Sequence, residues 1–254
     1  MVRSVGLALA MVLVAWGAPS PATAVAQTPT GLIAAADGAC QQEVTVGRSR
    51  EGRRIVACQV QGSTDDAAST LLVVGSMHGN EKGGLKVTSR LRATDLSGQG
   101  LDIWTIDTIN PDGHVRSRRG NLRRIDLNGN FPTTGWKQRF RGQDTYGGPR
   151  AASEPETRAM MKAMRTIRPE QVVVFHQRIN AIDCPPYRSR AMTTRLRELT
   201  GYRIRCLPVN HGNFTAWANS RYDWTTTVTF ELEARPPAAR LDRVAAGLVA
   251  LARG

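Results

Sequence analysis

A histidine and a carboxylate stand three positions apart in the segment His78-Gly79-Asn80-Glu81, directly after an apolar run. The run at residues 71–77 predicts a buried strand that presents both side chains at the edge of a sheet. Imidazole nitrogens and carboxylate oxygens bind zinc, and a catalytic zinc takes three protein ligands and leaves one position open. The segment therefore predicts half of a zinc site in a metalloenzyme, with a third ligand and a general base elsewhere.

The third ligand has to come from a short list, because the chain contains only four histidines. His176 ends the apolar run at residues 172–175, which is of the same kind as the run before His78. Two neighbouring strands would then present both imidazoles to one ion. A lone histidine at a strand end is commonly only a polar terminus, so His78 and Glu81 are what favour a ligand here. His114 and His211 lie in polar segments and are weaker candidates.

A strictly alternating segment at residues 226–233 predicts a strand with Thr229, Glu231 and Glu233 on one face. Two carboxylates on one face, close to strand ends that carry zinc ligands, suggest a general base for zinc-bound water. The alternative is an ordinary surface strand with solvated acids, and the histidines decide against it.

Strand-like and helix-like segments alternate along the rest of the chain. Ser153 and Glu156 form a capping-box pattern, followed by Met160 and Met164 at helical spacing, which predicts a helix with a methionine-lined core face. Further strands are expected within residues 44–61 and 101–108, and further helices at residues 81–92 and after Pro237. This order predicts an α/β fold, a three-layer sandwich with a mixed, mainly parallel central sheet flanked by helices. Ligands of such sheets gather at the carboxyl ends of strands, where the candidate site residues fall.

The first 26 residues have the pattern of a secretory signal peptide, with Arg3, an apolar stretch at residues 5–16 and small residues around Ala24. An uncleaved membrane anchor is the alternative, but the stretch is short for a span, which needs about 20 residues. We expect a signal at residues 1–26, a single zinc peptidase or amidase domain at 27–254, and no stable membrane insertion after cleavage. The protein would be secreted, extracellular or associated with the cell wall.

Export makes disulfides of the four cysteines plausible. Among three connectivities, sequential pairing of Cys40 with Cys58 and of Cys184 with Cys206 is expected, and free buried thiols are the alternative. The formal charge of +13 favours an anionic cell-wall polymer or membrane surface over nucleic acid, because the arginines are dispersed and no nucleic-acid motif appears. Charge that serves only solubility is the alternative.

Five sequence blocks, in this order, resemble the zinc carboxypeptidase family, which includes pancreatic carboxypeptidases and bacterial murein peptide amidases. The resemblance covers nearly the whole mature chain. The blocks are Gly47-Arg48-Ser49-x-x-Gly52-Arg53-x-Ile55, His78-Gly79-Asn80-Glu81, Asn110-Pro111-Asp112-Gly113, Asp126-Leu127-Asn128-Gly129-Asn130-Phe131-Pro132 and Ser153-Glu154-Pro155-Glu156-Thr157.

The resemblance implies a role for each of several residues. His78, Glu81 and His176 would bind one zinc ion per chain, and Glu231 would deprotonate the zinc-activated water. Arg119 would polarise the scissile carbonyl, with Arg118 and Arg123 as close competitors for that role. Asp126 would orient His78, and Asn128 would hold a terminal carboxylate or an equivalent polar group of the substrate.

One position departs from the family pattern. Gly129 stands where an arginine usually follows Asn128, so the pair that clamps the C-terminal carboxylate of the substrate is incomplete. No tyrosine stands at the usual distance before Glu231, and His211 is available in that region. Arginines within residues 116–124 or 139–141 would bind an anionic substrate instead.

These residues predict a secreted zinc peptidase or amidase that acts on a peptide or muropeptide, with diaminopimelate-containing stem peptides of peptidoglycan as the substrate. Two alternatives remain open. One is a cell-wall binding module on the same fold without catalysis, which the loss of a clamp at Gly129 would explain. The other is a deacylase of small N-acyl amino acids.

Overall fold

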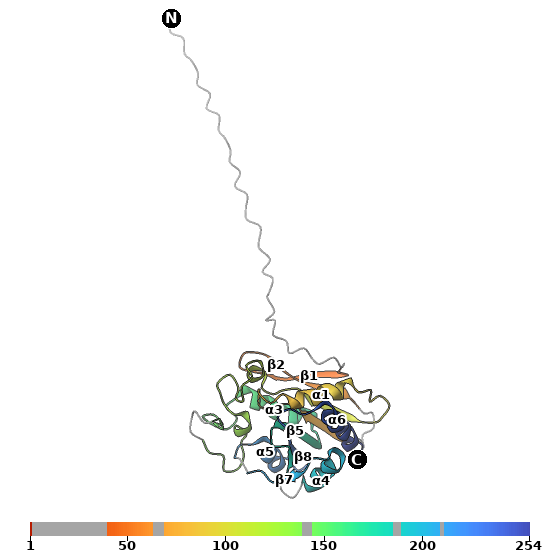
Figure 1. Ribbon diagram of the computed structural model, residues 1–254. Coiled ribbons are helices and arrows are strands. Elements are labelled where there is room, and N and C mark those ends of the chain that lie inside the picture. The colour runs from red at the N-terminus through yellow and green to blue at the C-terminus, as the bar shows by residue number, and fades with distance from the viewer. Residues whose placement is uncertain (2–39, 63–68, 139–143, 185–188, 209–210) are drawn as a thin grey trace. The chain divides into compact units, whose positions relative to one another are not determined.

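The computed structural model describes residue 1 and residues 40–62, 69–138, 144–184, 189–208 and 211–254. The predicted signal at residues 1–26 and the arginines within 139–141 lie outside these residues. The described part folds into strands and helices that alternate along the chain (Figure 1). The strands are β1 Gln42–Arg48, β2 Arg54–Gln61, β3 Thr70–Val74, β4 Asp102–Ile106, β5 Gln171–Gln177, β6 Ala181–Asp183, β7 Ile204–Arg205 and β8 Thr226–Leu232. The helices are α1 Gly83–Ala93, α2 Pro111–Val115, α3 Pro155–Ile167, α4 Arg190–Thr200, α5 Phe214–Arg221 and α6 Ala238–Ala252, with a 3₁₀ turn at Leu127–Gly129.

The described strands form one mixed sheet in the order β1-β2-β4-β3-β5-β8-β6-β7. The four central strands, β4, β3, β5 and β8, run parallel to one another. Antiparallel pairs join β1 to β2, β2 to β4, and β6 to β8. The predicted mixed and mainly parallel sheet is therefore confirmed, and the carboxyl ends of the central strands lie at one edge of it.

Two hydrophobic cores, one on each face of the sheet, make the three layers. Along β3, Leu71 and Val73 belong to the core under α1, α4 and α6, whereas Leu72 and Val74 belong to the core under α3 and α5. Because successive strand residues point to opposite faces, strands buried on both faces appear in the sequence as continuous apolar runs. Figure 1 shows α1 and α6 side by side on one face of the sheet.

The strand before the metal-binding motif is shorter than predicted. Strand β3 ends at Val74, and the chain leaves the sheet at Gly75 instead of continuing to residue 77. A Cβ on Gly75 would lie 2.7 Å from the carbonyl oxygen of Asp107, so only glycine allows this close turn. His78 and Glu81 are therefore carried by the turn between β3 and α1, and not by the strand itself.

The start of α3 also differs from the prediction. Pro155 occupies the first turn, Glu154 is the N-cap, and no side-chain cap hydrogen bond forms. The hydroxyl of Ser153 donates to Glu154 Oε1 at 2.9 Å, so the expected capping box is wrong. The methionine prediction is confirmed, because Met160 and Met164 are fully buried.

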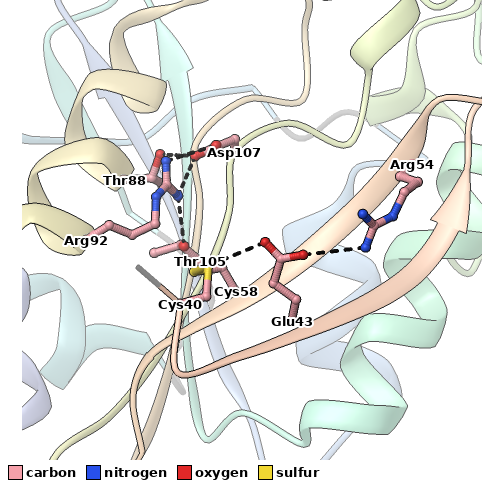
Figure 2. Close-up of a disulfide and its surroundings, with 8 residues drawn as sticks. All are labelled: Cys40, Glu43, Arg54, Cys58, Thr88, Arg92, Thr105 and Asp107. Carbon is pink, nitrogen blue, oxygen red and sulfur yellow. Dashed lines mark hydrogen bonds and ion pairs between the residues drawn. A yellow bond between two sulfur atoms is a disulfide. The ribbon is translucent and has the colours of Figure 1, made fainter. Parts of the chain in front are cut away.

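Both predicted disulfides are present. Cys40 is bonded to Cys58, which ties the start of β1 to β2, and Cys184 is bonded to Cys206. Figure 2 shows the first bridge at the end of the β1–β2 hairpin. Among the described residues, no helix is long and apolar enough to cross a membrane.

A partly buried ion pair near this bridge fixes α1 against the sheet. Arg92 donates from both Nη atoms to the carboxylate of Asp107, at 2.8 and 2.9 Å, and from Nη1 to the hydroxyl of Thr105 at 3.1 Å (Figure 2). Asp107 directly follows β4, so the pair joins the last turn of α1 to the carboxyl end of the sheet. This contact stabilises the edge at which His78 and Glu81 lie.

Candidate metal and catalytic site

The three predicted zinc ligands converge at the carboxyl edge of the sheet. His78 Nδ1 lies 2.9 Å from Glu81 Oε1, and His176 Nδ1 lies 3.2 Å from Glu81 Oε2. The Nδ1 atoms of the two histidines are 3.2 Å apart. All three side chains are buried, and their ligand-type atoms lie within 4.8 Å of one another. The structure thus gathers two imidazole nitrogens and one carboxylate around a single point.

The turn that carries His78 and Glu81 is closed by backbone contacts. The N–H of Glu81 donates to the carbonyl of His78 at 3.0 Å, which sets the two side chains on one side of the turn. A Cβ on Gly79 would lie 2.0 Å from the carbonyl carbon of Gly113, so glycine is required where this turn meets α2. This contact explains why the block around His78 and the block around Gly113 occur together in the sequence.

His176 and Glu231 are supplied by neighbouring parallel strands. They are partners in the register of β5 and β8, so their side chains leave the sheet on the same face. Glu231 is 8% exposed, and its Oε2 atom has no hydrogen-bond partner among the described residues. Burial raises the pKa of the Glu231 carboxyl. A buried carboxylate with a free oxygen beside the histidines is suited to accept a proton.

Glu233 does not join this site, so the prediction of two carboxylates on one face is wrong. Strand β8 ends at Leu232, and the alternation stops there. The Glu233 carboxylate accepts a hydrogen bond from the hydroxyl of Tyr202 and lies 3.5 Å from Arg240 Nε. Tyr202 packs on the ring of Phe230, which belongs to the opposite face of the sheet.

Asp126 joins His78 to Arg119. Asp126 Oδ1 lies 2.9 Å from His78 Nε2, and its Oδ2 accepts from Arg119 Nη2 at 2.9 Å. Burial alone would raise the pKa of Asp126, but His78 and Arg119 lower it to about 2. Burial likewise opposes the charged form of His78, but the carboxylates of Asp126 and Glu81 raise its pKa to about 9. An ionised Asp126 that accepts from Nε2 leaves Nδ1 of His78 free to act as a ligand.

Arg119 contacts one of the three proposed ligands, Glu81. Its Nη1 donates to Glu81 Oε1 at 3.3 Å. In the described part of the chain, neither competitor has a contact with a proposed ligand. Arg118 is exposed, and Arg123 Nη1 lies 3.6 Å from Glu154 Oε1 instead. Asn110 Nδ2 donates to the carbonyl of Arg119 at 3.1 Å and so fixes its backbone. Sequence reasoning did not single out Asn110, although it opens one of the five blocks.

Asn128 is joined to Asp126, and its backbone N–H and side-chain oxygen are both committed to the fold. Its backbone N–H donates to Asp126 Oδ1 at 2.9 Å, and its Oδ1 accepts from the N–H of Phe214 at 3.0 Å. These contacts leave the Nδ2 donor as the group of Asn128 that is suited to a carboxylate. His211, by contrast, is exposed beside Gly135, and no described contact links it to the ligands.

Gly129 sits where two other glycines approach it closely. A Cβ on Gly129 would lie 3.2 Å from Gly147 Cα, and a Cβ on Gly212 would lie 2.2 Å from the carbonyl oxygen of Gly129. Trp136 Nε1 also donates to that carbonyl oxygen at 2.8 Å. A side chain at Gly129 would therefore require the neighbouring backbone at Gly147 to shift by a few tenths of an ångström.

Residues of the other sequence blocks form a hydrogen-bond network around the loop that carries Arg119. The hydroxyl of Ser49 donates to Asp112 Oδ1 at 2.7 Å, which joins the first block to the third. Arg50 Nε donates to Glu154 Oε2 at 3.0 Å, and Asn121 Nδ2 donates to the same oxygen at 2.8 Å. The network positions the loop, and none of its contacts between described residues involves His78, Glu81 or His176.

The charge balance of the site suits a divalent cation. Three buried carboxylates, those of Glu81, Asp126 and Glu231, lie around the two imidazoles, and Arg119 is the cation that pairs with two of them. Burying carboxylates without a counter-charge is costly, and a metal ion removes that cost. Two nitrogen donors and one oxygen donor are the ligand types of a catalytic zinc site with an open position.

An α/β sheet with such a site at its carboxyl edge defines a metallohydrolase. Residues 33–200 match the family model described as zinc carboxypeptidase, and the chain belongs to this family. Murein peptide amidase A of Escherichia coli K12 is 30% identical over 128 residues, which cover 45% of this chain and 51% of that protein. The chain thus spans about half the length of this relative.

Solved structures agree on the fold. The murein-tripeptide amidase of Escherichia coli O157 superposes with a TM-score of 0.72 and 23% identity over 87% of this chain and 96% of that chain. Carboxypeptidase A of Helicoverpa armigera gives a TM-score of 0.68 and 18% identity over 84% of this chain and 68% of that chain.

Proposed function

We propose that this chain is a secreted zinc-dependent peptidase or amidase that hydrolyses an amide bond in stem peptides of peptidoglycan, with diaminopimelate-containing muropeptides as substrates. The observation that carries the proposal is the convergence of His78, Glu81 and His176 beside the partly free carboxylate of Glu231. Membership of the zinc carboxypeptidase family supports the reaction type. The similarity to a murein peptide amidase supports the substrate class.

His78, Glu81 and His176 would hold one zinc ion per chain, because their ligand-type atoms face one another and are buried. A bound zinc would lower the pKa of a water molecule and polarise the amide carbonyl. Glu231 would accept the proton of the attacking water and deliver it to the leaving amine. Its raised pKa makes the carboxylate a stronger base toward the attacking water.

The other residues would bind and orient the substrate. Arg119 would donate to the oxyanion that develops on the scissile carbonyl, and Asp126 and Asn110 would hold Arg119 in place for this purpose. Asn128 would donate from Nδ2 to a polar group of the substrate. Because Gly129 offers no side-chain donor, we infer that trimming of ordinary C-terminal residues is not the main activity.

Two disulfides support the proposed export, because such bonds persist in oxidising compartments. The basic composition supports contact with an anionic cell wall after export.

The test is mass spectrometry of defined muropeptides before and after incubation with the zinc-loaded mature chain. We expect two products whose masses sum to the substrate plus one water, and the pair of masses would identify the bond. The reaction should stop when zinc is removed by a chelator and resume when zinc is returned. Binding of muropeptides without any cleavage would favour the non-catalytic binding module. Faster turnover of a small N-acyl amino acid than of any muropeptide would favour the deacylase.

A further inference from the structure

An open cleft of about 1060 Å³ is lined by Glu81 and Arg119, and neither Asn128 nor Gly129 is among its lining residues. This volume is at the upper end of the range for small-molecule pockets, about 300–1,000 Å³, and suits a peptide. The cleft is strongly basic. Its lining includes Arg118, Arg119, Arg123, Arg124 and Arg178, against two acidic residues, Glu81 and Asp144.

Three of these arginines are exposed and have no ion pair with a described residue. Arg119 is committed to Glu81 and Asp126, and Arg123 lies close to Glu154. Arg118, Arg124 and Arg178 form no salt bridge within the described part of the chain. Their guanidinium groups, each with five donors in a planar fork, are therefore available to carboxylates in the cleft.

Arg124 occupies a backbone conformation that disfavours a side chain. Its φ is 59°, in the left-handed region where glycine or asparagine is relaxed. The turn is held there because Asn121 Oδ1 accepts from the N–H groups of Arg123 and Ile125, at 3.0 and 3.2 Å. A strained residue on the wall of a cleft points to a functional side chain, since glycine would satisfy the fold at lower cost.

The anionic end of a substrate has no arginine clamp at Gly129, so charge recognition has to come from another wall of the site. Building on the proposed function, we propose that Arg118, Arg124 and Arg178 form a carboxylate-recognition wall. This wall selects peptides that carry free carboxylates on the part of the substrate that lies in the cleft. Each arginine can donate two parallel hydrogen bonds to one carboxylate. These residues determine specificity and take no part in the proton transfers at Glu231.

The test measures binding as well as turnover. Two fluorescently labelled peptides of the same sequence are compared, L-alanyl-γ-D-glutamyl-diaminopimelate with free carboxylates and the same peptide with its carboxylates amidated. Fluorescence anisotropy with the zinc-loaded mature chain should show tighter binding of the acidic peptide. The difference in affinity between the two peptides should shrink as salt is raised from about 50 to 500 mM, because exposed charge pairs are screened. These concentrations are about one third and about three times physiological ionic strength.

The decisive variant is Arg124→Gly, because glycine suits the backbone at this position and the fold should be kept. We expect binding of the acidic peptide to weaken about threefold to tenfold and binding of the amidated peptide to stay unchanged. Arg168→Gly is the matched control. Arg168 also has a left-handed backbone, with φ of 53°, but it caps α3 before the start of β5. Arg168 precedes the start of β5, whereas His176 lies five residues along that strand, about 16 Å from its first residue.

The outcomes separate this inference from the proposed function. Binding that prefers the acidic peptide, weakens in Arg124→Gly and yields no hydrolysis would support the carboxylate wall and overturn the proposed reaction. Hydrolysis of both peptides at equal rates and with equal affinity would overturn the carboxylate wall and leave the proposed reaction standing. The wall is also overturned if Arg168→Gly weakens binding of the acidic peptide as much as Arg124→Gly does.

Discussion

His176 and Glu231 lie side by side as register partners on the parallel strands β5 and β8. Neighbouring strands lie about 4.8 Å apart, and register partners project to the same face of the sheet. The separation of the proposed zinc ligand and the proposed base is thereby fixed by the backbone ladder, which is more rigid than a loop. By contrast, His78 and Glu81 come from a turn and depend on neighbouring contacts for their position.

Replacing the proposed base should separate metal binding from catalysis. In Glu231→Gln we expect about one zinc per chain to be retained and turnover to fall by about 10²–10⁴-fold, because glutamine cannot accept the proton. Metal analysis and muropeptide turnover measure the two properties. Glu233→Gln is the control and should keep its turnover, because the Glu233 carboxylate contacts Tyr202 and Arg240 instead of the site. Equal activity of Glu231→Gln and the native chain would refute the assignment of the base.

Removing the charge of Asp126 should weaken metal binding. Asp126→Asn replaces the carboxylate that accepts from His78 and Arg119 by a neutral amide. We expect zinc affinity to fall about 10–100-fold, a typical effect of losing a residue that orients a metal ligand. Competition with a chromophoric chelator measures the affinity. Asp95→Asn, an exposed change, is the control, and a variant at Asp126 with native affinity would contradict the role.

Restoring the usual arginine should fail to restore a clamp. In Gly129→Arg the new Cβ would lie 3.2 Å from Gly147 Cα, so we expect the free energy of unfolding to fall by about 1–3 kcal/mol. No gain in release of C-terminal residues from neutral peptides is expected, and urea unfolding and peptide turnover measure the two effects. Gly129→Ala separates the cost of the Cβ from that of the longer side chain. A stable Gly129→Arg variant that trims C-terminal residues would contradict this prediction, because it would show that the backbone around Gly147 can shift to accommodate the arginine.

The network behind the Arg119 loop should make stability depend on pH. Burial alone would raise the pKa of the Glu154 carboxyl. The hydrogen bonds that Glu154 accepts from Arg50 and Asn121 outweigh burial and lower this pKa. A lowered folded-state pKa means that the ionised carboxylate stabilises the fold above the unfolded value of 4.5, and this contribution is lost as pH falls through the folded value.

Glu154→Gln should therefore lower the free energy of unfolding by about 1–3 kcal/mol at neutral pH. The difference from the native chain should shrink below pH 4.5, the ordinary pKa of this group. Urea unfolding across this pH range measures it, with the exposed change Glu170→Gln as control. A difference that stays constant with pH would mean that the charge of Glu154 does not contribute.

Several elements could be predicted because they depend on local pattern. The apolar runs at β3 and β5 are buried on both faces, so they stand out in the sequence without any knowledge of the fold, and β8 stands out by its alternation. The errors occurred where a distant contact decides the local structure. Strand β3 ends early because Gly75 meets Asp107, and Glu233 leaves the face of Glu231 because Tyr202 and Arg240 bind it.

The sequence by itself determined the donor set, because His-x-x-Glu, a histidine at a strand end and a glutamate in an alternating strand are local features. It also indicated the pairing of the cysteines. Only the tertiary structure decided which arginine reaches the ligands and which arginines line the cleft. The physical reason is that four arginines of the same chemistry stand close together in the sequence, at positions Arg118, Arg119, Arg123 and Arg124. Asn110 Nδ2 donates to the carbonyl of Arg119, and Asn121 Oδ1 accepts from the N–H of Arg123, so different tertiary contacts hold the backbone of each arginine.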